Sequence, residues 1–268
     1  MSEKEVNQSD SMSFWDHLDI LRGSLIKICI SAVCCGIFAF IFKDEVFDIL
    51  LSPSKDSFII YRILDDIVSL INNGNSGTFD VQLINTGLST QFMIHMKTSI
   101  YIGFMLSSPY ALYLIFRFIS PALYANERKY TTYVVCWGYL MFIAGILLSY
   151  FLVFPLTFRF LGTYQVSEEI TNMISLESYM DTLLMMSMAL GIIFELPILC
   201  WLFAKLGFLS ADYMRRFRRH AIVLILIVAA IITPTSDIFT MTLVAMPIWL
   251  LFELSILIVG HSQKKNGM

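Results

Sequence analysis

Acids that interrupt long apolar runs are the strongest candidates for chemistry in this sequence. Glu195 lies in the middle of such a run, in Phe194-Glu195-Leu196-Pro197. Pro197 cannot donate a backbone hydrogen bond, so it frees a carbonyl and bends a helix beside the acid. A charge in hydrocarbon needs a cavity or a partner, and no basic residue lies within one helical turn. We therefore predict that Glu195 faces a concave surface and holds a polar group of a partner helix or a transported segment.

Two further acids stand next to apolar runs rather than inside them. Asn126 can cap a helix, and Glu127 would then lie at the favourable positive end of its dipole. The same acid can accept a guanidinium through two parallel hydrogen bonds. Asp19 and Arg22 are three residues apart and share a helix face. For this pair the alternatives are a solvated ion pair and a binding site.

Lys97 and Glu253 also fall in apolar runs, near the ends, where each either snorkels to the surface or faces a cavity or a partner. Catalytic templates are absent, since the sequence has no HExxH, no GxSxG and no Walker motif. The four histidines are scattered and the five cysteines have no metal-ligand spacing. We therefore expect no enzyme activity, no metal and no cofactor.

The amino-acid composition indicates that membrane-spanning helices position these residues. The chain is 57% hydrophobic and only 15% charged, with a mean hydropathy of +0.72. Soluble domains are about one quarter charged, so this chain is typical of a membrane protein. Its long apolar runs must be helical, because hydrocarbon offers no partner for free backbone groups.

The predicted fold is all-α, with six transmembrane helices in a bent, concave bundle. Pro109, Pro155 and Pro247 fall inside predicted helices and favour bending. Residues 1–268 form a single integral membrane domain, with a cytoplasmic N-terminal segment 1–23, helices over about 24–259 and a cytoplasmic tail 260–268. The predicted spans are 24–42, 92–118, 131–156, 179–205, 219–233 and 239–259, of which the fifth and the sixth are short.

The charges predict the orientation. Thirteen of the eighteen basic residues fall on the same side as the N-terminus, and the opposite loops gather acids such as Asp44, Glu45 and Asp48. The positive-inside rule therefore places both termini in the cytoplasm. The basic run 215–220 needs no explanation beyond this rule, so we predict no nucleic-acid partner. In the long outer loop, residues 58–71 have the spacing of an amphipathic helix, and Phe79, Val81 and Leu83 alternate as in a short extended segment.

Six blocks of the sequence, in order, resemble the TatC family, the multi-spanning subunit of the twin-arginine protein translocase. The resemblance covers about residues 13–260. The blocks are His17-Leu18-Asp19-Ile20-Leu21-Arg22, the segment from Phe118-Ile119-Ser120-Pro121 through Tyr124 to Glu127-Arg128, Tyr150-Phe151 with Phe154-Pro155, Phe194-Glu195-Leu196-Pro197, Thr233-Pro234-Thr235-Ser236-Asp237, and Pro247 through Phe252-Glu253.

The resemblance implies a receptor without catalytic chemistry. Members of this family bind signal peptides carrying two consecutive arginines at the cytoplasmic face of the bacterial inner membrane. They recruit single-helix subunits of the TatA and TatB types into an oligomeric complex, which exports folded proteins with the proton-motive force. The residues implied in signal-peptide binding are Asp19, Arg22, Phe118, Tyr124, Glu127 and Arg128, and those implied as intramembrane polar contacts for partner helices are Glu195, Thr233 and Asp237.

One position departs from the family pattern. The acid of the N-terminal block falls at position 20, which is Ile20 here, and Asp19 lies about 100° around the helix from it. Either Asp19 takes over the role, or Glu127 carries the binding alone. Two other function classes compete with the receptor: a proton-coupled transporter using Glu195, which usually shows a repeated architecture that this sequence lacks, and an intramembrane enzyme, for which no nucleophile–base pair is visible.

Overall fold

A computed structural model describes residues 14–63, 82–119, 131–165, 167, 172–233 and 237–265. Five helical stretches among them are long and apolar enough to cross a bilayer: Leu18–Ile41, Thr90–Phe118, Val134–Thr163, Leu176–Lys205 and Ile238–Gln263. The predicted fifth span is helix α10, Arg218–Ile232, with 15 residues. At 1.5 Å per residue it extends about 22 Å, which is shorter than the ~30 Å hydrocarbon core. The prediction of an all-helical membrane bundle with a short fifth span is confirmed. The prediction that the sixth span is also short is wrong, because its helix, Ile238–Lys265, has 28 residues and continues beyond the apolar run into a polar last turn.

The first half of the chain contains two long helices and a small cap. In order, its elements are α1 (Phe14–Ile41), α2 (Lys43–Leu51), the 3-10 helix η1 (Ser52–Ser54), β1 (Leu83–Ile84) and α4 (Thr90–Ile119). The second half contains α5 (Thr131–Leu148), the π-helix η4 (Ser149–Val153), α6 (Phe154–Thr163), β2 (Ile174–Ser175), α7 (Leu176–Ile193), α8 (Leu196–Lys205), α9 (Ala211–Arg216), α10 and α11 (Ile238–Lys265).

Two of the spans are bent. The third runs from α5 through the π-helix η4 into α6, whose first turn contains Pro155. The fourth is divided at Phe194–Glu195 into α7 and α8, directly before Pro197. The predicted bend beside Glu195 is therefore observed, and it places the acid at the break rather than on a regular helix.

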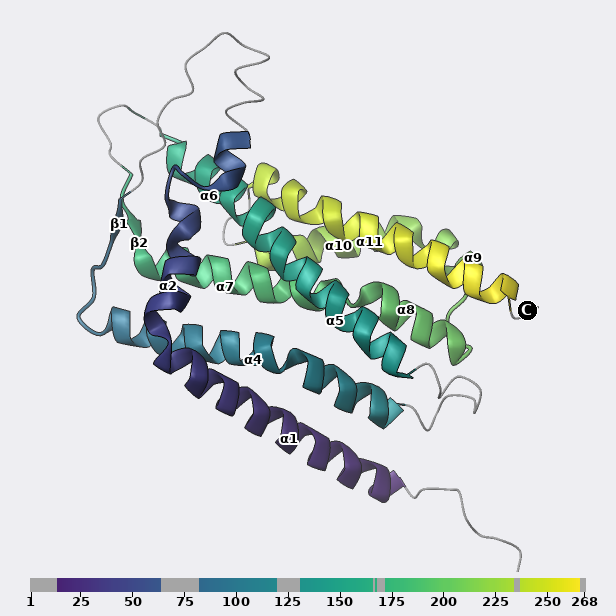
Figure 1. Cartoon of the computed structure of the whole chain (residues 1–268). Helices are drawn as coiled ribbons and strands as arrows, with labels where there is room; N and C mark the ends of the chain where they lie inside the picture. The colour runs from purple at the N-terminus through teal and green to yellow at the C-terminus, as the bar shows by residue number, and fades with distance from the viewer. Residues whose placement is uncertain are drawn as a thin grey trace, which may run out of the picture.

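The two ends of the bundle differ in character (Figure 1). One end holds the start of α1, the last turn of α4, the end of α8 and α9. We call it the basic end, since Arg22, Arg117, Lys205 and the arginines of the α9–α10 junction belong to these elements. The opposite end, which we call the capped end, holds α2, β1 and β2.

Helix α1 lies at one edge of the bundle and packs chiefly against α4 (Figure 1). The two backbones approach closely at Gly36 and Gly103. A Cβ added at Gly103 would lie 2.4 Å from the carbonyl oxygen of Ala32 and 2.8 Å from Cα of Gly36. Small residues allow such close packing between membrane helices, so these two glycines fix the position of α1.

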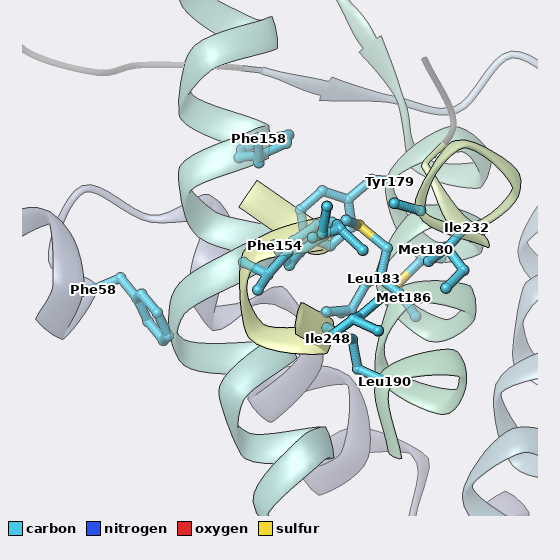
Figure 2. Close-up of a cluster of buried hydrophobic side chains, with 14 of the residues drawn as sticks. Phe58, Phe154, Phe158, Tyr179, Met180, Leu183, Met186, Leu190, Ile232 and Ile248 are labelled. Carbon is cyan, nitrogen blue, oxygen red and sulfur yellow. The ribbon is translucent and has the colours of Figure 1, made fainter. Parts of the chain in front are cut away.

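The main hydrophobic core joins α6, α7, α10 and α11. Figure 2 shows Phe154, Tyr179, Met180, Ile232 and Ile248 gathered there. The rings of Phe154 and Tyr179 meet edge to face, with centroids 5.1 Å apart, an arrangement that aromatic pairs favour. This core holds these four helices together and also includes Ile94 of α4.

Three tyrosines form hydrogen bonds with backbone carbonyls of α2 and η1 at the capped end. Tyr150 Oη donates to Ile49 O at 2.6 Å, Tyr179 Oη donates to Leu50 O at 2.9 Å, and Tyr61 Oη lies 2.9 Å from Pro53 O. Burial raises the pKa of the Tyr61 phenol, against a smaller lowering by Arg159, so it remains a donor at physiological pH.

The predicted features of the long loop are described only in part. Residues 59–63 are helical, whereas residues 64–81, which include most of the predicted amphipathic helix together with Phe79 and Val81, lie outside the described residues. Leu83 is in a short strand as predicted, since β1 pairs in parallel with β2, Leu83 opposite Ile174.

Candidate functional site

The first turns of α1 expose Leu18, Asp19, Ile20 and Arg22 of the N-terminal block. Asp19 and Arg22 both have exposed side chains. Neither side chain makes a hydrogen bond or an ion pair with another described residue. Both are therefore accessible to a ligand at the basic end. Ile20 is 44% exposed, and its apolar side chain offers no hydrogen-bond acceptor to a ligand. Asp19 is the exposed acid next to Ile20 in this helix.

The other predicted signal-peptide residues belong to the connection between α4 and α5. Phe118 lies in the last turn of α4, half-buried, next to the exposed Arg117. Tyr124, Glu127 and Arg128 lie outside the described residues. The helix ends that flank them, at Ile119 and Thr131, are both at the basic end, with the start of α1 (Figure 1). The structure thus brings Asp19, Arg22 and Phe118 to one end of the bundle.

Glu195 is buried at the break between α7 and α8, with 7% of its surface exposed. Its backbone carbonyl accepts hydrogen bonds from the N–H groups of Ile198 and Leu199, so the backbone is satisfied on the α8 side. The side-chain Oε1 has no hydrogen-bond partner among the described residues. An orphaned buried carboxyl oxygen is costly, so a functional role for this side chain stays a prediction that the geometry motivates.

The carboxyl of Glu195 faces α5 at a glycine. A Cβ added at Gly138 would lie 3.1 Å from Oε2 of Glu195, so Gly138 leaves the space that the carboxyl occupies. An apolar groove of about 350 Å³ lies between α5, α8 and α11, and it reaches Pro197 and Ile198, the second and third residues after the acid. Its lining includes Trp137, Met141, Pro197, Ile198, Trp201 and Leu254. A polar group beside an apolar groove suits a membrane-spanning segment that carries one polar side chain.

Thr233 and Asp237 do not join Glu195. They follow the end of α10 and precede the start of α11, at the capped end (Figure 1). Asp237 Oδ1 accepts a hydrogen bond of 2.7 Å from Thr240 N, as an N-cap of α11 does. Thr233 is buried. The predicted set of intramembrane polar residues is therefore divided between the capped end and the break in the fourth span.

Lys97 and Glu253, the other two charges within apolar runs, both form ion pairs. Lys97 Nζ of α4 lies 3.0 Å from Asp181 Oδ2 and 3.6 Å from Glu177 Oε1, both on α7. Arg218 Nη2 at the start of α10 lies 2.7 Å from Glu253 Oε2 of α11. Of the two alternatives left open for Lys97 and Glu253, pairing is the one observed. The spacing of Glu177 and Asp181, one helical turn apart, is the signal that could have identified them as a pair facing one cation.

Comparison with known proteins supports one family over the whole chain. The profile described as Sec-independent protein translocase protein (TatC) matches residues 16–247. The chain is 31% identical to the Sec-independent protein translocase protein TatC of Blattabacterium sp. subsp. Periplaneta americana, covering 97% of this chain and 99% of that protein. It is 32% identical to TatC of Aquifex aeolicus, over 95% of this chain and 98% of the relative.

Solved structures agree in fold. The crystal structure of a twin arginine translocase receptor, TatC, superposes with a TM-score of 0.73 at 31% identity, covering 90% of this chain and 97% of the other. A crystal structure of such a receptor in the detergent DDM gives 0.75 at 32% identity, covering 91% and 99%. The family profile, the relatives and the solved structures each match most of the chain. The chain therefore belongs to the TatC family of Sec-independent protein translocase proteins.

Proposed function

We propose that this protein is the receptor subunit of a twin-arginine translocase and binds signal peptides with two consecutive arginines at the basic end of its bundle. The observation that carries the proposal is the meeting at this end of the exposed Asp19, the last turn of α4 with Phe118, and both flanks of the segment that holds Glu127. As a translocase component the protein is not an enzyme.

The chemistry of recognition follows from the residue types. Two adjacent guanidiniums need fixed carboxylates, and each carboxylate can accept two parallel N–H bonds. Asp19 is exposed and unpaired within the described residues, so binding would break no existing ion pair there. Glu127 supplies a second carboxylate in the segment that follows Phe118. With two acids, Asp19 and Glu127, each carboxylate can bind one of the two guanidiniums.

Orientation follows from the charge distribution. The basic end faces the cytoplasm, because lysine and arginine are retained on that side of a bacterial inner membrane. Arg117, Lys205 and Arg216 all lie at this end. A cytoplasmic signal peptide would thus meet the exposed acids before its apolar segment enters the bilayer.

Partner subunits would use the groove beside Glu195. We expect a single-helix subunit of the TatA or TatB type to lie along Trp137, Trp201 and Leu254, with a polar side chain facing the free Oε1 of Glu195. Helices associate in lipid through packing and interhelical hydrogen bonds. An orphaned carboxyl oxygen next to an apolar groove meets both conditions.

Photocrosslinking tests the proposed peptide site. A photoreactive amino acid replaces Phe118, and a matched control replaces Leu88, an exposed residue at the capped end. A signal peptide with an arginine pair should crosslink from position 118 and not from position 88, and replacing its pair by two lysines should reduce the yield. Equal yields from both positions, or no effect of the lysine pair, would overturn the proposal.

A further inference from the structure

An unneutralised basic patch lies at the junction of α9 and α10. Four of five consecutive residues there are arginines. Arg215 pairs with Asp212 at 3.3 Å and Arg218 pairs with Glu253 at 2.7 Å. Arg216 and Arg219 have exposed side chains and neither a hydrogen bond nor an ion pair within the described residues. Two guanidiniums three residues apart are therefore uncompensated.

The patch is held by a docked helix. Ala211 and Met214 of α9 are buried against Ile256 and Val259 of α11, and Ala211 N donates to Gln263 Oε1 at 3.1 Å. The backbone that carries Arg216 is thus fixed on α11, although its side chain is exposed. A ligand at the patch would meet a preformed site rather than a loop that must first be ordered.

Aromatic rings accompany the free arginines. Tyr213 and Phe217 stack with their centroids 4.4 Å apart and are 54% and 39% exposed. Exposed aromatic side chains at the end of a membrane helix are typical of the headgroup region, where one side of the ring is apolar and the other wet. Their position places Arg216 and Arg219 at the depth of the lipid phosphates.

The short α10 brings lipid to this patch from the apolar side. Directly after the arginines, Ile222, Val223 and Leu224 are 45–61% exposed and can contact acyl chains. A helix of 15 residues is shorter than the hydrocarbon core, and the bilayer thins around such a helix. Thinning draws the headgroups towards the first turn of α10, where Arg219 lies.

We propose that Arg216 and Arg219, with the stacked Tyr213 and Phe217, form a binding site for the phosphate headgroup of an anionic phospholipid. Guanidinium forks match phosphate oxygens in bidentate geometry, and the exposed aliphatic side chains of α10 receive the acyl chains. A signal peptide with an arginine pair is cationic and is repelled by this patch. The site is therefore distinct from Asp19 at the same end and from Glu127 of the segment between α4 and α5.

Lipid titration followed by native mass spectrometry tests the site. The purified full-length protein is titrated with phosphatidylglycerol, with phosphatidylcholine as the neutral lipid. Basic residues at a membrane surface contribute about 1 kcal/mol each, so Arg216→Gln/Arg219→Gln should weaken the first phosphatidylglycerol association roughly ten- to thirty-fold. Binding of phosphatidylcholine should not change, and Arg216→Lys/Arg219→Lys should lie between wild type and the glutamine variant.

Two controls test whether binding of the lipid depends on this site, and not on positive charge alone or on phosphate alone. Lys43→Gln/Lys55→Gln removes the same charge at the capped end, where both side chains are exposed, and should leave the first association unchanged. Millimolar inorganic phosphate should not displace the lipid. The proposal is overturned if Arg216→Gln/Arg219→Gln binds phosphatidylglycerol like wild type, if the lysine control weakens it equally, if inorganic phosphate displaces it, or if an acidic peptide binds the patch and phosphatidylglycerol does not.

Discussion

Replacing Gly103 by alanine should displace the helix that carries Asp19. The added Cβ would lie 2.4 Å from the carbonyl oxygen of Ala32 and 2.8 Å from Cα of Gly36, and both neighbours are backbone atoms that cannot rotate away. Ordinary contact begins at 3.4 Å, so α1 and α4 must separate by about 1 Å at this point. Because α1 packs chiefly against α4, the strain moves α1 and leaves the main core intact.

The expected cost is that of an overpacked contact. Such contacts destabilise by about 1–3 kcal/mol, which lowers a thermal midpoint by roughly 2–4 °C per kcal/mol in a protein of this size. Thermal unfolding of the purified protein in detergent measures the stability. Binding of an arginine-pair signal peptide to the same samples measures the displacement of Asp19, and Gly103→Ala should bind more weakly than wild type.

Gly23→Ala is the matched control. Gly23 is on α1, and a Cβ added there would meet nothing within 4 Å. Alanine also favours a helix over glycine by roughly 0.8–1 kcal/mol, so this variant should be at least as stable as wild type. The reasoning fails if Gly103→Ala melts like Gly23→Ala and binds the peptide equally well.

Three further predictions concern the membrane-embedded acid, the α4–α7 ion pair and the topology. Glu195→Ala should block export while peptide binding survives, whereas Glu195→Gln should be nearly silent because no described cation approaches the carboxyl; normal export and unchanged partner crosslinks in Glu195→Ala would show that the acid is merely tolerated. Lys97→Met and Asp181→Asn should each cost at most about 1 kcal/mol in thermal unfolding, since the pair is partly exposed, and the double variant should cost little more than either; additive losses would contradict the pairing. A cysteine at Lys264, in a background without the native cysteines, should react with an impermeant thiol reagent only after the inner membrane is opened, and labelling of intact cells would refute the orientation.

The bend at Glu195 could be predicted from the sequence because its cause is local. Pro197 lacks a donor, and the helix is interrupted two residues before it. The short fifth span was likewise visible, since the apolar run between His220 and Thr233 is brief. In the same way, the resemblance of six ordered blocks indicated the family that the whole-chain comparison confirms.

Contacts between distant helices could not be predicted in this way. The partners of Lys97 depend on the relative depth of α4 and α7, which no local pattern fixes. The π-helix at Ser149–Val153 contains neither glycine nor proline, so nothing within it predicts the change of helical register. Three tyrosines donate hydrogen bonds to the carbonyls of Ile49, Leu50 and Pro53. These contacts depend on how the loop after α2 folds back over the bundle, which the sequence does not show.

The central claim is tested most directly by the affinity of an arginine-pair signal peptide for the purified protein in nanodiscs, compared between wild type, Asp19→Asn and Glu127→Ala. Hydrogen bonds between charged groups contribute about 1.5–3 kcal/mol. We expect Glu127→Ala to lose roughly ten- to hundred-fold in affinity and Asp19→Asn to lose affinity as well, since Asp19 takes the place of the acid absent at Ile20. A peptide with two lysines should bind weakly to all three proteins. Equal affinity of the arginine-pair peptide for wild type and for both variants would contradict recognition of the signal peptide at the basic end.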